Sequence, residues 1–470
     1  NLSHDYNGVP PVLERLGNVS FRGEVSGYFT DIVTYGQLHT DLGGVNMDLK
    51  LSSDKSKGLF AYSGAVKTTD YKLGKLLANE QLGEITFNLD VHGRHVTDRL
   101  PVVELKGLIA SVDYSRYRYE IITLDGEYKQ GVFNGKVALD DPNGSIYLNG
   151  DVNVSSRIPT FNFQAIINKL RPHDLNLTSK YPDTEFSLKL RANFTGGSVD
   201  EMIGEINVDS LEFMSPEKQY FMNNMNIRAS KQNNENQLRL TSEFLTASVE
   251  GKFQYHTLPA SILNIMRKYV PSLILPPKKP IETHNNFQFD IHIYNTDILS
   301  TIFDIPLTVY THSTLKGYFN DPLQRLRVEG YFPRLQYKNN FIESGMILCE
   351  NPSDHIRARV RLTNLKKKGA VNLSLDAQAK DDNISTTLNW GNSAAVTYSG
   401  QLAAVAKFLR TEGEKPLLKA MVEVKPTDII LNDTLWQIHP SQVVVDSGKV
   451  DVNNFYFSHQ DRYVRINGRL

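Results

Sequence analysis

Two short stretches carry residue types that could bind a cation. His92 and His95 are three residues apart, and imidazole is a common zinc ligand. In an extended strand, a spacing of three sends two side chains to opposite faces, so this pair does not predict a shared metal site. The run from Asp140 to Gly144 offers oxygen ligands but lacks the distal ligands of a calcium loop. Its Pro and Asn-Gly instead favour a tight turn.

Other reactive constellations are missing from the sequence. It contains no His-Glu-x-x-His, no phosphate-binding glycine loop and no Gly-x-Ser-x-Gly elbow. Its single cysteine, Cys349, permits neither an intrachain disulfide nor a cysteine metal site. We therefore expect a protein that is not an enzyme and that uses no cofactor and no metal.

Charge and hydropathy narrow the class of partner. The chain has 51 basic and 52 acidic residues, a net charge of −1, which argues against nucleic acid as a partner. Lys278, Lys279 and the run 366–368 could meet lipid phosphates, although solvated turns explain them as well. No apolar run is long enough to cross a membrane. Because the chain starts at Asn1 and opens with polar residues, we expect a soluble piece of a longer protein.

The elements that would position any site follow from a repeated septet of the form apolar, any, apolar, any, Gly, any, apolar. It uses nine of the 31 glycines, whereas chance at this apolar content would give about two. Read as a strand, the septet places its apolar residues and the glycine on one face and the polar residues on the other. It recurs at 19–25, 60–66, 103–109, 122–128, 146–152, 247–253, 326–332, 396–402 and 464–470.

Only a few helices interrupt the predicted strands. We predict helices over 71–80, with Asp70 as the N-cap, and over 161–170, 261–269 and 297–303. The Pro-rich run 276–280 is the best candidate for a linker. The strand at 133–139 and the strand at 145–154, joined by the turn at 141–144, form the clearest hairpin. We expect three segments: 1–160, 161–280 and 281–470.

The short gaps between strands favour antiparallel neighbours. The fold class is therefore all-β: an elongated antiparallel meander with a few short helices. Its apolar face could line an open hydrophobic groove formed by curling of the sheet, like a taco, or it could fill the cores of two or three closed sandwiches. The pattern leaves both arrangements open. In the groove, the residues lining it would be Ile146, Leu148, Val152, Leu188, Leu190, Phe287, Phe289, Ile291, Val371, Leu373, Leu375, Val464 and Ile466.

Several stretches resemble one family of bacterial envelope proteins. They are the runs 429–441, 448–455 and 464–470, together with 21–27, 40–43, 124–128 and 135–150. In their strand-repeat texture they are similar to the TamB family (translocation and assembly module subunit) in its Bacteroidetes form. The wider relatives are the AsmA-like and bridge-like lipid-transfer proteins.

The resemblance implies a function. It implies a periplasmic bridge that carries phospholipid acyl chains between the inner and outer membranes and supports outer-membrane biogenesis. It further implies a BamA-type outer-membrane barrel protein as partner and an N-terminal inner-membrane anchor, both through regions that this chain lacks, so we expect an internal segment. The alternative is a structural or adhesive module of several β-sandwiches, with glycans as candidate ligands.

Overall fold

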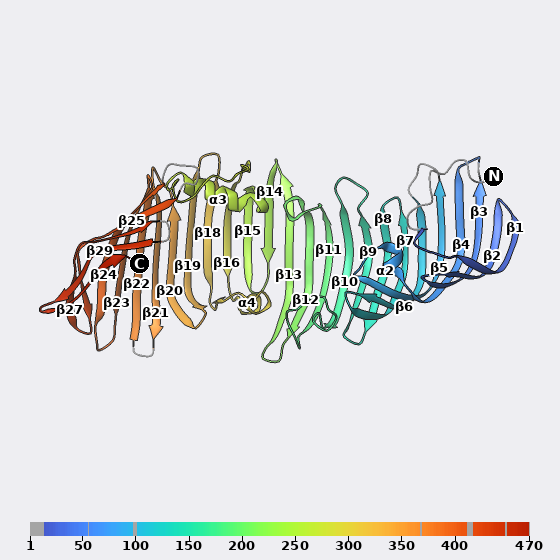
Figure 1. The fold of residues 1–470 in the computed structure, drawn as a ribbon, viewed down its shortest axis with the longest axis horizontal. Helices are drawn as coiled ribbons and strands as arrows, with labels where there is room; N and C mark the ends of the chain where they lie inside the picture. Colours follow the sequence, from blue (N-terminus) through green and yellow to red (C-terminus); the bar gives the residue numbers. More distant parts are fainter. Residues whose placement is uncertain are drawn as a thin grey trace. The chain divides into compact units, whose positions relative to one another are not determined.

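The computed structural model describes residues 14–54, 56–96, 101–366, 369–410, 417–446 and 449–469. The chain divides into two compact units, Asn1–Asn226 and Ile227–Leu470. In Figure 1, strands that are adjacent in the chain lie side by side within each unit, and the few helices are short. The predicted all-β antiparallel meander is confirmed. The expected division into three segments stays a prediction.

Unit 1 is a simple meander in which each strand from β1 to β12 pairs antiparallel with the next one in the chain. The boundary between the units falls within β13 (Gln219–Gln232). The strands of unit 1 are β1 (Ser20–Tyr28), β2 (Asp31–Thr40), β3 (Gly43–Asp54), β4 (Leu59–Tyr71), β5 (Leu82–Val96), β6 (Val102–Tyr114), β7 (Tyr117–Lys129), β8 (Val132–Asp141), β9 (Gly144–Asn153), β10 (Thr160–Leu170), β11 (Glu185–Thr195) and β12 (Ile203–Met214), with helix α2 (Leu73–Leu77) and the 3-10 turn η1 (Val199–Glu201).

Unit 2 continues the same antiparallel pattern from β14 to β30. Its strands are β14 (Glu235–Thr241), β15 (Leu245–Lys252), β16 (Asn286–Ile293), β17 (Leu307–Val309), β18 (Ser313–Asn320), β19 (Arg325–Tyr337), β20 (Asn340–Glu350), β21 (Ile356–Lys366), β22 (Gly369–Lys380), β23 (Asn383–Asn392), β24 (Tyr398–Arg410), β25 (Leu418–Val424), β26 (Thr427–Leu431), β27 (Thr434–Ile438), β28 (Ser441–Asp446), β29 (Lys449–His459) and β30 (Arg462–Arg469). Its helices are α3 (Leu258–Arg267), preceded by the 3-10 turn η2 (Tyr255–Thr257), and α4 (Asp297–Ile302).

Three pairs of short strands in unit 2 are long strands with an interruption. Both β25 and β26 pair with β24, and Pro426 lies between them. Likewise β27 and β28 both pair with β29, with Pro440 between them. Proline has no N–H to donate, so it breaks the ladder without ending the meander. The third pair, β17 and β18, shares β19.

The predicted hairpin at 133–154 is confirmed as β8 and β9. Asp141 pairs with Gly144 across the turn, and Asp141 Oδ1 accepts a hydrogen bond from the Asn143 N–H at 2.9 Å. Gly144 has φ +128, and a Cβ there would lie 2.5 Å from Leu170 Cα. The run from Asp140 is therefore a turn that requires glycine at its end.

Two helix predictions need correction. Residues 161–170 form strand β10, not a helix. Phe163, Ile166, Ile167 and Leu170 fit helical spacing, but Phe161, Phe163 and Ile167 also alternate at period two, and the strand ladders to β9 and β11 favour that reading. The helix predicted at 71–80 shrinks to α2, with Lys72 in place of Asp70 at its N-cap. The helices predicted at 261–269 and 297–303 are confirmed as α3 and α4.

The buried core is small and gathers where short segments cover the sheet. One cluster joins Ile265, Tyr269 and Val270 to Phe319 and Leu326 of the sheet, together with Ala379. The other joins Leu175 to Tyr119 and Leu170. Among the other described residues, Tyr181 lies against Phe186 and Phe213, and many apolar side chains of the strands are exposed or half-buried.

Candidate functional site: an open apolar sheet face

In unit 1 the pairing of strands aligns apolar side chains into a row across the sheet. This row takes one residue from each strand from β3 to β12, and we call it the unit 1 row. No member is polar or charged, so the row is a continuous apolar strip perpendicular to the strands. Its members are Met47, Val66, Leu89, Gly107, Leu124, Val137, Leu148, Ala165, Leu190 and Val208.

Unit 2 has an equivalent row, which we call unit 2 row. Ten strands at a spacing of ~4.8 Å make a strip about 43 Å long. Again no member is polar or charged. Its members are Leu240, Ala247, Ile291, Leu315, Gly330, Ile347, Val360, Leu375, Leu388 and Leu402.

These rows are not sealed inside a core. Among the described residues, 47 large apolar side chains are exposed and only 21 apolar residues are buried. Leu148 is 38% and Ile347 36% exposed, and most other row members are half-buried. Closed sandwiches would have buried both rows. The exposure of row members favours the open face, and the alternative of two or three filled sandwiches stays a prediction.

The opposite face of the same strands is polar and self-paired. Lys106 and Asp125 lie 3.1 Å apart on β6 and β7. Arg359 pairs with Asp376 on β21 and β22 at 2.9 Å between nitrogen and oxygen. Cross-strand pairs of opposite charge are typical of a solvated sheet face. The two faces of the sheet thus differ sharply in chemistry, as the septets predict.

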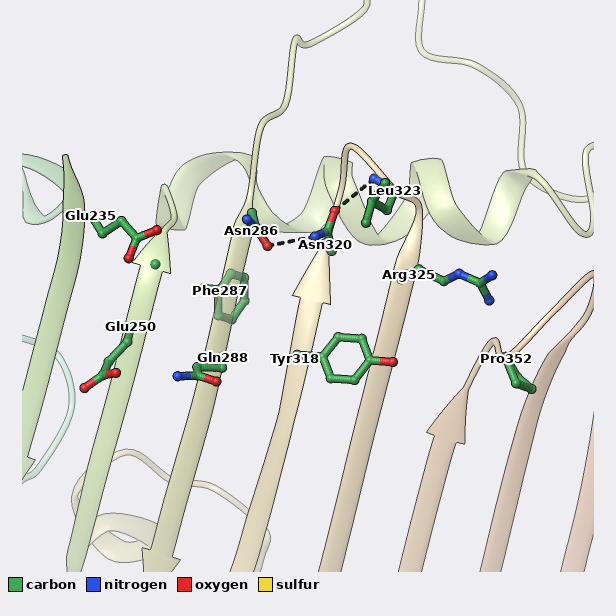
Figure 2. Close-up of a pocket in the computed structure, with 11 residues that line it drawn as sticks. Glu235, Glu250, Asn286, Phe287, Gln288, Tyr318, Asn320, Leu323, Arg325 and Pro352 are labelled. Atoms are coloured by element: carbon green, nitrogen blue, oxygen red, sulfur yellow. Dashed lines mark hydrogen bonds between the residues drawn. The ribbon is translucent and has the colours of Figure 1, made fainter. Parts of the chain in front are cut away.

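A shallow pocket on this polar face is shown in Figure 2. Glu235, Glu250, Gln288 and Arg325 contribute polar groups to its lining, beside the exposed ring of Tyr318. Helix α3 passes behind the strands in this view. The lining is too polar for an acyl chain, so the candidate site is the apolar face.

A strap, residues 255–275, covers one end of the apolar face in unit 2. It contains α3, whose Ile265 is 0% exposed and packs in one cluster with Phe319 and Leu326. Phe287 and Cys349 are packed against this cluster. Burial raises the pKa of the Cys349 thiol, which keeps it protonated and unreactive.

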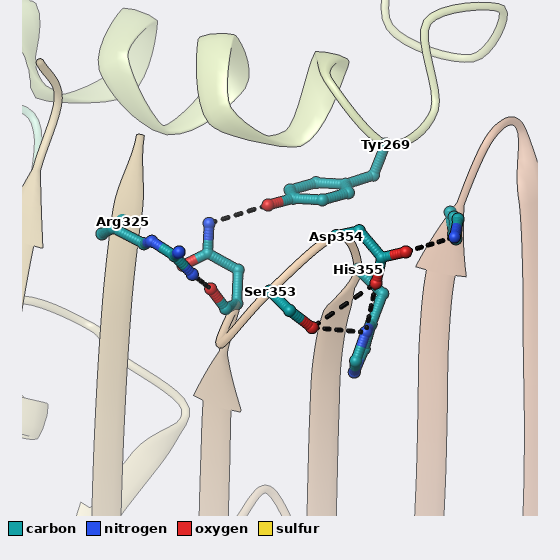
Figure 3. A network of polar contacts seen from close by, with 7 residues as sticks. Tyr269, Arg325, Ser353, Asp354 and His355 are labelled. Carbon is teal, nitrogen blue, oxygen red and sulfur yellow. Dashed lines mark hydrogen bonds and ion pairs between the residues drawn. The ribbon is translucent and has the colours of Figure 1, made fainter. Parts of the chain in front are cut away.

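Hydrogen bonds fix the strap to the turns at the strand ends. Ser261 Oγ donates to Asp321 Oδ2 at 2.9 Å, and Asn351 Nδ2 donates to Tyr269 Oη at 2.9 Å. Figure 3 shows Tyr269 pointing from the strap toward the β20–β21 turn, where Ser353, Asp354 and His355 form a polar network. Ser272 Oγ donates to Asp382 Oδ2 at 2.9 Å. The strap is therefore held along its length.

Unit 1 has a smaller cover of its own. Leu175 is 0% exposed in a cluster with Tyr119 and Leu170, against which Ile122 and Ile146 pack. Tyr119 Oη donates to the Leu175 carbonyl oxygen at 2.8 Å. Leu175, in the segment that follows β10, thus shields one end of the apolar face of unit 1.

The structure places the predicted lining residues on the apolar faces of their own units, and their role as a lipid-lining set stays a prediction. Leu148 and Leu190 belong to the unit 1 row, and Ile291 and Leu375 to the unit 2 row. Ile146 pairs with Ile167, which pairs in turn with Leu188, in the row next to the unit 1 row. Val152 lies further along β9.

In unit 2, Phe287 lies under the strap, and Phe289 lies next to Phe287 on the same strand face. Leu373 faces Leu362 and Trp390, and Val371 shares its strand face. On β30, Val464 and Ile466 are 48% and 50% exposed.

Some residues of the face were missed by the sequence reading. Trp390 and Trp436 belong to a further row through Leu373, Gly400 and Ile429. The alternation of these tryptophans with polar neighbours in their strands is the sequence signal that could have placed them on the apolar face. The apolar side of α3 that faces away from the sheet was also missed, since a helical pattern does not say what each side contacts.

The described residues offer no other chemistry. They contain no group of three or more His, Cys, Asp or Glu that could hold a metal ion. His92 pairs with Ser63 and His95 with Phe60 along β5, so the two side chains lie on opposite faces of the strand. Within the described ranges, none of the helices has the length and hydropathy of a membrane span. Lys367 and Lys368 lie outside the described residues.

Comparison with known proteins adds no relative. The chain matched no family model, no curated protein and no solved structure.

Proposed function

We propose that this chain is a non-enzymatic, lipid-conducting segment whose apolar sheet face carries phospholipid acyl chains. One observation carries the proposal: within the described residues, two rows of ten have no charged or polar member, and apart from Ala165, Val208 and Gly330 their members are exposed or half-buried. Soluble proteins rarely leave so much contiguous apolar surface without a ligand or partner. Burying a sixteen-carbon chain there would gain on the order of 10 kcal/mol, at ~0.8 kcal/mol per methylene.

The uniformity of the rows favours movement over storage. Neighbouring positions along each row are chemically alike, so a lipid that shifts by one strand exchanges one apolar contact for another. No charged or polar side chain in the rows would hold it at one place. We therefore propose transport along the row, perpendicular to the strands.

The cellular setting is part of the same proposal and rests on the resemblance to the TamB family. It is a periplasmic bridge between the inner and outer membranes, with a BamA-type barrel protein as partner of the complete protein. Phospholipid would be the cargo.

The test is photo-crosslinking to lipid in cells. A benzophenone amino acid placed at Leu373 or Leu375, on the apolar side of β22, is expected to capture phospholipid, identified by mass spectrometry of the purified adduct. Matched positions on the same strand are Asn372 and Gln378, which are exposed on the polar side. They are expected to give at least tenfold less adduct. Equal labelling of both sides, or no lipid at either, would refute the proposal.

A further inference from the structure

Helix α3 carries apolar residues on two sides. One side, with Ser261, Ile265 and Leu258, faces the sheet, and Ile265 is fully buried. A neighbouring flank carries Ile262 and Met266, which are 45% and 38% exposed, and Leu263, 46% exposed, lies opposite the buried Ile265. A surface helix that only covered a core would be polar on its outer side. The exposed apolar residues of α3 therefore need a partner.

Helix geometry shows where this exposed side points. At roughly 100° per residue, Ile262 and Met266 lie on one flank of the sheet-facing side, Asn264 and Lys268 lie on the other flank, and Leu263 lies about 160° from Ile265. Asn264 and Lys268 lie beside Asp321 and Gln324 of the β18–β19 turn, at the strand ends. The flank with Ile262 and Met266 is therefore the side away from the strand ends, and it borders the open part of the sheet face.

The strap that carries α3 is a fixed wall. Ser261, Tyr269 and Ser272 are each bonded to a different turn of the sheet. Arg410 Nε also donates to the Ser272 carbonyl oxygen at 2.7 Å. Bonds to three turns and to β24 hold α3 beside the unit 2 row, so its exposed side faces whatever occupies that row.

The chemistry of the space limits the occupant. The strands β16 and β18 to β23 pair on both sides, so these described strands leave no unpaired edge to bind a peptide strand. A linear acyl chain needs no hydrogen bonds and fits two apolar walls.

The charge near the strap indicates the headgroup. Between Tyr255 and His284 the chain has four basic residues and one acidic residue, a net charge of +3, whereas the whole protein has a net charge of −1. Asp321 and Asp382 nearby already accept bonds from Ser261 and Ser272.

We propose that α3 and the unit 2 row form the two walls of a slot for one acyl chain of a negatively charged phospholipid, with the headgroup at the basic strap. This inference rests on the proposed function and adds a preferred lipid class and a place of contact. Arg267, Lys268, Lys278 and Lys279 supply the positive charge that favours an anionic headgroup.

The experiment uses the full chain with a benzophenone amino acid at Met266, at Leu375 or, as a control on the polar face, at Gln288. Each protein is mixed with phosphatidylglycerol or phosphatidylcholine of identical acyl chains. We expect adducts at Met266 and Leu375, none at Gln288, and at least threefold more phosphatidylglycerol than phosphatidylcholine at Met266. The double variant Lys278→Glu, Lys279→Glu should remove this preference, and circular dichroism checks that it folds.

The outcomes separate the two proposals. Adducts at Leu375 without adducts at Met266 would overturn the slot and leave the lipid-conducting face standing. Adducts at neither position would overturn both. Equal yields with the two lipids at Met266 would overturn the anionic headgroup while keeping α3 as a wall.

Discussion

Asn351 Nδ2 donates a hydrogen bond of 2.9 Å to the hydroxyl of Tyr269, 82 residues earlier in the chain, and both residues are 2% exposed. Asn351 also donates to the Gln324 carbonyl oxygen and accepts from the Leu326 N–H at 2.8 Å. One buried amide thus connects the strap to two strands of the apolar face. The position of α3 depends on this group.

This contact predicts two different losses. Tyr269→Phe removes one of the partners of Asn351 and should cost about 1 kcal/mol. Asn351→Ala leaves the Leu326 N–H, the Gln324 carbonyl and the Tyr269 hydroxyl without their partner and should cost roughly 2–4 kcal/mol. Hydrogen exchange of the α3 amides measures both. Equal protection of α3 in the two variants would contradict the central place of Asn351.

A charge in the unit 2 row should block lipid contact more than it harms folding. Leu388→Glu places a carboxylate on a half-buried position of the row. An unpaired charge beside an acyl chain should weaken binding by tenfold or more, about 1.4 kcal/mol. Lipid capture at the neighbouring Leu373 measures the effect. The matched variant is Ser385→Glu, exposed on the same strand, which should leave capture unchanged; an equal loss in both would argue against a role for the row.

One glycine of the repeated septet predicts a sharp stability contrast. Gly251 has φ +130, and an added Cβ would lie 2.3 Å from the Asn286 carbonyl oxygen. Gly251→Ala should therefore destabilise unit 2 by about 2 kcal/mol or more. At Gly391 the nearest atom to an added Cβ is Ser399 Cβ at 3.8 Å, so Gly391→Ala should be neutral or stabilising by up to about 1 kcal/mol. Urea unfolding compares the two, and a larger loss at Gly391 would contradict the assignment.

The β8–β9 turn predicts a loss of stability at alkaline pH in unit 1. Tyr117 Oη donates to Asp141 Oδ1 at 2.6 Å, and burial, reinforced by this carboxylate, raises the pKa of Tyr117 to about 12. The unfolded pKa is about 10, so the folded state holds the proton more tightly. The resulting stabilisation is complete below pH ~10 and is lost as pH rises toward ~12.

Tyr117→Phe tests this dependence. The variant should be less stable at neutral pH, because Asp141 and Asn143 lose a partner, and its stability should fall less between pH ~10 and ~12 than that of the parent chain. Thermal unfolding over this range is the measurement. Tyr463→Phe, at a ring that is 63% exposed, is the matched substitution and should keep the parental slope. A parental slope in Tyr117→Phe would contradict the role of this hydroxyl.

Local patterns were sufficient for the meander and its two faces. The alternation in β11 and β16 and the Asn-Gly turn before β9 each depend on neighbours in sequence, so the residues themselves determine them. The same local reading failed at β10, where residues 161–170 satisfy both a helical and a strand period. The hydrogen-bond ladders to β9 and β11 favour the strand there, because they pair the backbone of β10 on both sides while Ala165 joins the unit 1 row.

The sequence by itself determined that one side of every strand would be apolar, because side-chain direction in a strand follows from position alone. Only the tertiary structure decided which part of that side stays open. The cover in unit 2 depends on contacts such as Ser272 with Asp382, 110 residues apart, and on the side of α3 that meets Phe319 and Leu326. Such contacts have no trace in local spacing, since each side chain's partner is set by the folded path of the whole chain.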